Sequence, residues 1–220
     1  MRTIRITGRG QFRMKPDMTR IVISLEGICP DYADALRSSA KATERLRKLV
    51  EELAFNGSDL KTLSFNVDTE YESYKEHGSF KQRLVGYKFH QVLKIEFESD
   101  NVRLGKVLYA LANCELKPEF QVSYTLKDPE KAKNKLLGEA VADARKKAEV
   151  LTRTAGVGLK DIQSIDYSWG QVNLEVHPMN RMLAMEDCME ASSAKQSFEM
   201  AIEPDDVELT DTVTIIWEIG

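Results

Sequence analysis

Seven stretches of this 220-residue chain alternate apolar and polar side chains with a period of two. This period is typical of β-strands that bury one face against a core. Amphipathic helical patterns lie between several of these stretches, and the length suits one domain. We therefore expect an α+β fold over residues 1–220, in which two long helices and a short one pack on one face of a largely antiparallel sheet of about seven strands.

The first two stretches are predicted to form a hairpin. The first places Ile6 on its apolar side, and the second places Ile23 on its own. Between them, Pro16 fixes one backbone angle and Asp17 can hydrogen-bond to its own main chain, as in many tight turns. Pro16 and Asp17 are therefore predicted to be structural residues of the turn.

The first long helix is predicted to run from Pro30 to about Phe55. Asn56-Gly57 follows it, and glycine readily takes the left-handed conformation that ends many helices, so Gly57 is the predicted stop. The helix is expected to bury Tyr32, Leu36, Ala40, Thr43, Leu46, Val50 and Leu53. The short helix, capped by Ser99 or Asp100, is expected to bury Val102, Val107, Leu108 and Leu111.

Asp128-Pro129 predicts the start of the second long helix. An aspartate at the N-cap accepts a hydrogen bond from the main chain, and proline suits the first helical position. The pattern continues to about Ala155, and Gly156 is the expected stop. The predicted apolar stripe is unusually small and consists of Leu137, Ala140, Val141, Ala144, Ala148 and Leu151.

Gly8 and Gly10 fall on the inward side of the first strand, where glycine leaves space for another backbone. One interpretation is that the second long helix crosses the first strand at these glycines. The alternative is a β-bulge at Gly8-Arg9-Gly10. Contacts between residues 137–151 and residues 6–12 distinguish the two.

Residues from about 169 to 206 break the strand and helix patterns. They are polar and contain Pro178 and Pro204. Long segments without regular structure are uncommon inside compact domains. We expect a flexible or assembly-related insertion.

Composition excludes several classes of protein. A net charge of −4 does not suit a nucleic-acid-coating protein, and no apolar run approaches the roughly 20 residues that span a bilayer. Three cysteines argue against a disulfide framework. The first residues lack the apolar block of a signal peptide. The expected location is cytoplasmic for the chain as written, and periplasmic or secreted if an export signal was removed.

The sequence contains no recognisable catalytic set. A nucleophilic site needs Ser or Cys beside a base with an orienting acid, and no signature joins His77, His90 or His177 to a nucleophile. Cys29 and Cys114 have no partner at zinc-ligand spacing. We expect no enzyme activity and no cofactor, although an unrecognised active site stays open.

A row of soft side chains is the one weak metal candidate. Thioether and thiolate sulfur select Cu(I), whereas methionine oxidation would turn the row polar and give a redox response. A third interpretation is an ordinary packing helix or a disordered segment. The residues are Met179, Met182, Met185 and Met189, with His177 and Cys188 beside them.

Charged residues occupy the outward sides of the strands. Arg5, Arg9 and Arg13 lie on the first, and Asp68 and Glu70 lie on the third. The main interpretation is cross-strand ion pairing on a solvated face, and the alternative is a basic groove for an acidic ligand. The fourth strand adds Lys88, Lys94, Glu96 and Glu98.

Several segments together resemble one known family. They are Ile6-Thr7-Gly8-Arg9-Gly10, Lys15-Pro16-Asp17, Val85-Gly86-Tyr87, Asp128-Pro129-Glu130, residues 139–149, Ile202-Glu203-Pro204 and residues 213–219. In this order they are similar to the SIMPL-domain family, long described as a domain of unknown function. The resemblance implies an α+β fold and little chemistry. It associates bacterial relatives with oxidative-stress defence and with secreted or periplasmic antigens, and an animal namesake with binding a signalling kinase.

These observations favour a non-enzymatic binding or self-assembly module. Unpaired strand edges can pair with another chain, so we expect a homo-oligomer, with a protein partner as a further option and no nucleic-acid partner. The alternative is an oxidative-stress protein that uses the methionine and cysteine segment chemically or as a Cu(I) ligand.

Overall fold

The computed structural model describes residues 2–76, 79–167 and 203–220, which divide into two compact units. The first unit comprises residues 2–17, 125–167 and 204–220, and the second comprises residues 18–76 and 79–124. The expected insertion at about 169–206 lies almost entirely outside the described residues. The description of residues 1–220 as one domain with this insertion therefore stays a prediction.

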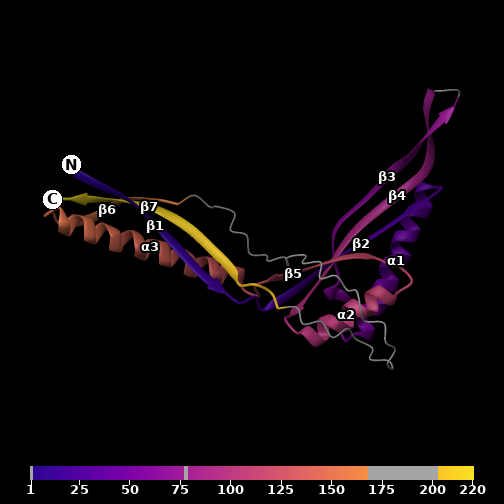
Figure 1. Ribbon diagram of the computed structural model, residues 1–220, viewed down its shortest axis with the longest axis horizontal. Helices are drawn as coiled ribbons and strands as arrows, with labels where there is room; N and C mark the ends of the chain where they lie inside the picture. The colour runs from indigo at the N-terminus through magenta and orange to yellow at the C-terminus, as the bar shows by residue number, and fades with distance from the viewer. Residues whose placement is uncertain (1, 77–78, 168–202) are drawn as a thin grey trace, which may run out of the picture. The chain divides into compact units, whose positions relative to one another are not determined.

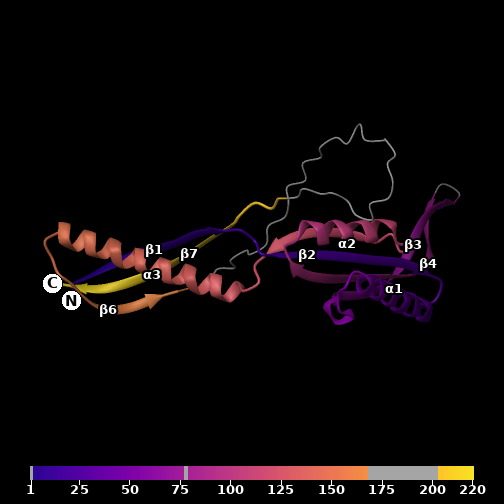
Figure 2. The ribbon, with the colours of Figure 1, turned by 90° about the horizontal axis from the view of Figure 1, so that it is seen from below.

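The first unit is a three-stranded antiparallel sheet covered by one helix. The strand order is β1 (Arg2–Met14), β7 (Val207–Ile219), β6 (Leu159–Asp166). Helix α3 (Pro129–Thr154) runs along β1 and β7, as Figures 1 and 2 show. The main core cluster consists of Ile6, Ala140, Ala144, Ala148, Val213, Ile215 and Trp217.

The second unit is a four-stranded sheet with two helices in βαββαβ order, the arrangement called ferredoxin-like. Its sheet order is β3-β4-β2-β5, and both helices contribute to one core with β2 and β4. The elements are β2 (Met18–Cys29), α1 (Tyr32–Glu52), the 3₁₀ turn η1 (Gly57–Asp59), β3 (Lys61–Glu76), β4 (Ser79–Glu98), α2 (Asn101–Asn113) and β5 (Glu119–Thr125). None of the described helices is long and apolar enough to cross a membrane.

The predicted α+β class, three helices and seven largely antiparallel strands are confirmed, and the strands are divided between two sheets. The predicted hairpin of β1 and β2 is wrong, because β1 pairs with β7 and β2 pairs with β4. Pro16 is buried, and the Asp17 carboxylate accepts a hydrogen bond from the Lys127 backbone N–H at 2.7 Å. Pro16 and Asp17 therefore lie in the segment that links β1 of one sheet to β2 of the other.

Helix α1 buries a face rotated from the predicted one at its N-terminal half. Ser39 is buried, whereas Leu36 and Tyr32 are exposed. The cause is Gln91, a buried polar residue of β4 whose Oε1 accepts hydrogen bonds from the hydroxyls of Ser39 at 2.6 Å and Thr43 at 2.9 Å. A buried amide needs such partners, so it draws the polar side of α1 inward.

Helix α3 buries a narrower line than predicted. Leu151 and Val141 are exposed, because the helix touches its sheet along residues spaced four apart. On α2, the expected burial of Val102 is wrong, since its side chain is 64% exposed. The buried α3 residues are Ala132, Leu136, Ala140, Ala144, Ala148 and Thr152.

Three of the four predicted ends of the two long helices agree with the structure. Asp128 caps α3 by accepting a hydrogen bond from the Lys131 N–H at 2.9 Å, and Pro129 is its first residue. Gly156, just after α3, has a φ of 69°. The predicted stop of α1 at Gly57 is wrong, because Ala54 takes the left-handed conformation with a φ of 62°.

Candidate interaction surfaces

The described residues bring no catalytic or metal-binding set together. His90 is exposed on the face of β4 that points away from the core, and Cys29 and Cys114 are half-buried free thiols. Over residues 2–76, 79–167 and 203–220, no three His, Cys, Asp or Glu side chains lie close enough to hold a metal ion.

The weak metal candidates lie outside the described residues. They are Met179, Met182, Met185, Met189, His177 and Cys188, and His77 is also outside. The copper and redox interpretations therefore stay predictions.

Helix α3 approaches β1 closely at the two glycines singled out by the sequence. A Cβ atom on Gly8 would lie 2.1 Å from the carbonyl oxygen of Ala140, and one on Gly10 would lie 2.1 Å from that of Leu136. Strand β1 pairs with β7 through both glycines in continuous register, with no bulge. The structure thus has the close approach and excludes the bulge.

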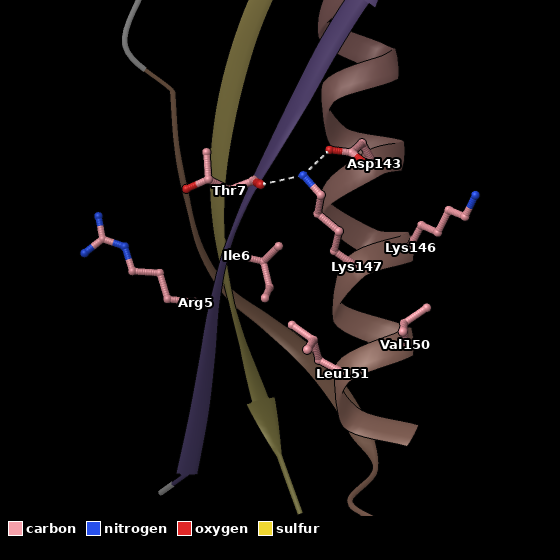
Figure 3. Close-up of a pocket in the computed structure, with 8 residues that line it drawn as sticks. All are labelled: Arg5, Ile6, Thr7, Asp143, Lys146, Lys147, Val150 and Leu151. Carbon is pink, nitrogen blue, oxygen red and sulfur yellow. Dashed lines mark hydrogen bonds and ion pairs between the residues drawn. The ribbon is translucent and has the colours of Figure 1, made fainter. Parts of the chain in front are cut away.

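Two side chains of α3 bind the free edge of β1 beside Gly8. The Asp143 carboxylate accepts the Arg9 backbone N–H at 2.8 Å, and the Lys147 ammonium donates to the Thr7 carbonyl at 3.3 Å. Asp143 and Lys147 also form an ion pair at 2.7 Å. Figure 3 shows Lys147 reaching across from α3 between the two groups. We call Asp143 and Lys147 the edge clasp.

The edge clasp shifts the acidity of its carboxylate. The hydrogen bond from Lys147 lowers the pKa of Asp143 below its ordinary value of 3.8, and the Arg9 N–H lowers it further. Both contacts favour the charged form. Because Lys147 and Arg9 already engage this carboxylate, it suits edge protection better than acid-base chemistry.

Beside the clasp, a shallow groove of about 540 Å³ runs between β1 and α3. Ile6 and Leu151 point toward one another across it, whereas Arg5 points away from α3 (Figure 3). Val150 and Leu151 are about half exposed on the rim. The groove is apolar inside, and Asp143 is the one carboxylate among its lining residues.

Arginines line the opposite face of β1. Arg5, Arg9 and Arg13 alternate with inward residues and are all exposed. Arg13 pairs with Glu208 on the neighbouring strand β7. No ion pair joins Arg5 or Arg9 to another of the described residues.

Charges of the second unit form the cross-strand pairs expected as the main interpretation. Lys88 on β4 pairs with Glu26 on β2 at 2.8 Å, and this contact lowers the pKa of Glu26 and raises that of Lys88. Arg20 on β2 reaches Glu96 on β4 at 2.6 Å. Lys94, on the same strand as Glu96, reaches the same carboxylate at 2.9 Å. These pairs neutralise much of the outer face of β2 and β4.

The paired ends of β3 and β4 form an arm that continues past the rest of the second unit (Figure 1). Its described side chains, residues 71–75 and 79–85, are all exposed. Tyr71 lies opposite Leu84, and Lys75 lies opposite Phe80. Opposite residues share a face, so Tyr71, Leu84 and Phe80 lie on one side of the arm, which we call its apolar face. The same face also carries Ser73, Lys75 and Gln82.

The apolar face of the arm continues the helix-covered face of the sheet. Along β3, Phe65, Val67 and Tyr71 alternate on that face, and Val67 packs against the core. Phe65 and Tyr71 are about half exposed, and Phe80 is 79% exposed. Helix α1 begins at Tyr32 and has few contacts with β3. None of the described helices covers this continuation of the core face.

Sequence reasoning missed two parts of these surfaces. The apolar side of the arm was not predicted, although the parity of Phe80 with Leu84 could have placed both on one face. Asp143 and Lys147 have the i, i+4 spacing of ordinary helix-surface ion pairs. Nothing in that spacing indicates that they bind a strand edge.

Comparisons with known proteins give one family and a few distant relatives. The family model named SIMPL, described as "Protein of unknown function (DUF541)", matches residues 4–217. An "Uncharacterized protein YggE" of Edwardsiella ictaluri is 25% identical over 93% of this chain and 82% of that protein. A "26 kDa periplasmic immunogenic protein" of Brucella melitensis is 23% identical over 74% of this chain and 65% of its own length. The Brucella abortus protein of the same name is 22% identical over the same shares.

Proposed function

Since this chain belongs to the SIMPL family, a family of unknown function, we propose that it is a non-enzymatic module that associates with further copies of itself. The observation that carries the proposal is the uncovered apolar face of the β3–β4 arm. An isolated two-stranded ribbon is at best marginally stable in water, so an arm of this kind gains stability by packing against a partner.

The chemistry of the described residues supports a role without catalysis. The groove between β1 and α3 contains one carboxylate, and it is already bound by Lys147 and the Arg9 N–H. A site for acid-base or nucleophilic catalysis needs at least two convergent groups with suitable pKa values. Assembly requires only surfaces that can bind a partner, and the exposed apolar side chains of the β3–β4 arm support this role.

A periplasmic location is part of the proposal. The two Brucella relatives carry the word "periplasmic" in their names, which favours the periplasmic alternative over the cytoplasmic one. Fractionation of the native cells with an antibody to this chain tests it. Recovery with the cytoplasmic fraction alone would contradict the periplasmic assignment.

The arm is tested by light scattering on the full chain after size-exclusion chromatography. The double variant Phe80→Gln, Leu84→Gln makes the apolar face polar while leaving the core untouched. We expect the mass of the assembly to fall at a given concentration. Because both side chains are exposed, the free energy of unfolding should change by less than about 0.5 kcal/mol.

Val102→Gln is the matched control, since Val102 is an exposed apolar residue of the same unit on α2. It should leave the mass unchanged. An unchanged mass for the arm variant, or an equal loss for the control, would contradict the role of the arm. A monomeric wild-type chain would contradict the proposed function as a whole.

A further inference from the structure

We propose that the free edge of β1 in one copy pairs with the free edge of β3 in a second copy. This inference rests on the proposed self-assembly and names the surfaces that carry out one of its contacts. The sheet of the first unit would then continue into the sheet of the partner's second unit.

Over residues 2–76, 79–167 and 203–220, both strands lie at the ends of their sheets. Strand β1 is terminal in the order β1-β7-β6, and β3 is terminal in the order β3-β4-β2-β5. A terminal strand presents a row of backbone N–H and C=O groups that can accept another strand. The edge clasp takes the Thr7 carbonyl and the Arg9 N–H in the middle of β1, and the proposed contact uses the segment on its N-terminal side.

The apolar faces of the two elements complete one another. Helix α3 lies over β1 and presents Val150 and Leu151, which are about half exposed beside the groove. On β3, Phe65 and Tyr71 point to the helix side of the sheet but are about half exposed. Phe65 lines a hollow beside α1, whereas Tyr71 lies beyond that helix. These half-exposed side chains thus meet a helix with exposed apolar residues beside a strand edge. Pairing would bury these side chains together.

The charges on the other face are complementary. Arg5 and Arg9 point to the uncovered side of β1, and Asp68 and Glu70 point to the uncovered side of β3. In a parallel alignment that sets Asp68 opposite Arg5, Glu70 falls opposite Thr7, diagonal to both arginines. Opposite charges on facing strands stabilise their pairing, and like charges oppose it.

The edge clasp sets the end of the docking site. The backbone groups that it takes, the Thr7 carbonyl and the Arg9 N–H on either side of Gly8, are groups that an added strand would use in either direction. An added strand therefore cannot continue along β1 past Gly8.

The test is a charge-swap experiment on the full chain. One variant carries Arg5→Glu and Arg9→Glu, and the other carries Asp68→Arg and Glu70→Arg. Arg5, Arg9 and Asp68 are exposed and Glu70 is half-buried on the outer face of β3, so folding should be intact by circular dichroism. Each variant alone should self-associate more weakly, with a dissociation constant raised by about tenfold or more. An equimolar mixture should restore association through contacts between the two variants.

Lys146→Glu is the control, because Lys146 lies on α3 but points away from β1 (Figure 3). It should not change the dissociation constant. Added salt should weaken wild-type association, as screening predicts for exposed charges. The β1–β3 contact would be overturned if either variant associated as tightly as wild type, or if the mixture failed to restore association. Self-assembly would then have to use another surface. A wild-type chain that never associates would overturn the proposed function as well.

Discussion

The Asp143 carboxylate of α3 accepts a hydrogen bond from the backbone N–H of Arg9 at 2.8 Å, although 134 positions separate them in the sequence. Together with Lys147 on the Thr7 carbonyl, it makes two contacts that a neighbouring strand would otherwise make. Helices and charged side chains commonly protect sheet edges from uncontrolled pairing. Here the protection covers only the middle of β1, which confines strand pairing to the remainder.

The edge clasp predicts an acid-dependent part of the stability. Lys147 and the Arg9 N–H lower the pKa of Asp143 in the folded chain below its ordinary value of 3.8. A carboxyl group with a lowered folded-state pKa stabilises the fold above its unfolded pKa, and this stabilisation is lost as the pH falls through the folded value. Asp143→Asn should therefore be less stable than wild type near neutral pH, and the difference should shrink at pH values below about 4.

Urea denaturation at a series of pH values measures this difference, and Glu139→Gln on the same helix is the control. The control should not reproduce the pH-dependent gap. A gap between wild type and Asp143→Asn that stays constant down to the lowest pH would show that the carboxylate charge is not responsible.

The close approach of α3 predicts that Gly8 cannot be replaced. A Cβ at this position would lie 2.1 Å from the Ala140 carbonyl oxygen and 2.5 Å from the Ala144 nitrogen, which are backbone atoms that cannot turn aside. Gly8→Ala should lower the free energy of unfolding by about 3 kcal/mol, as for overpacked cores. Gly138→Ala is the matched control, since nothing lies within 4 Å of its Cβ position.

Gly138 lies within α3, so its replacement by alanine should stabilise the chain by about 1 kcal/mol. Both variants are measured by urea denaturation. A Gly8→Ala variant as stable as wild type would mean that α3 does not press on β1.

The helix caps predict that replacing Asp128 costs more stability than replacing Asp31. Asp128 accepts the Lys131 N–H at the start of α3, whereas Asp31, at the N-cap of α1, makes no side-chain cap hydrogen bond. Asp128→Ala should cost about 1 kcal/mol. Asp31→Ala should change the free energy of unfolding by less than about 0.5 kcal/mol. Thermal or urea unfolding compares them, and equal losses would contradict the assignment of the cap.

The methionine and cysteine segment gives a separate test of the oxidative-stress alternative. Leucine keeps the apolar bulk of methionine and removes its sulfur. If the segment acts chemically, the fourfold variant should lose any peroxide tolerance that the wild-type chain confers on cells. An unchanged tolerance would remove this alternative. The substitutions are Met179→Leu, Met182→Leu, Met185→Leu and Met189→Leu.

The elements of the fold could be predicted from the sequence, but their pairing could not. Alternation reports which face of a strand is buried, as it did for Ile21, Ile23 and Leu25. It does not report which strand lies alongside. Pro16 and Asp17 have the composition of a hairpin turn, yet they connect strands of two sheets. Partner choice depends on long-range contacts such as Asp17 with Lys127.

The candidate surfaces were predictable only in part. Gly8 and Gly10 pointed to the close approach, because glycines on the inward side of a strand leave space. The exposure of Tyr32 and Leu36 was not predicted. Buried Gln91 needs hydrogen-bond partners and turns the polar side of α1 inward, which the helical periodicity of the sequence does not indicate. The pairing of Tyr71 with Leu84 also depends on a register shift between Glu70 and Tyr71.

Sedimentation equilibrium of the wild-type full chain, over a concentration series through the micromolar range, tests self-assembly most directly. Self-assembly predicts an average mass that rises with concentration to a multiple of the 25.0 kDa chain. A mass that stays at one chain throughout the series would contradict it.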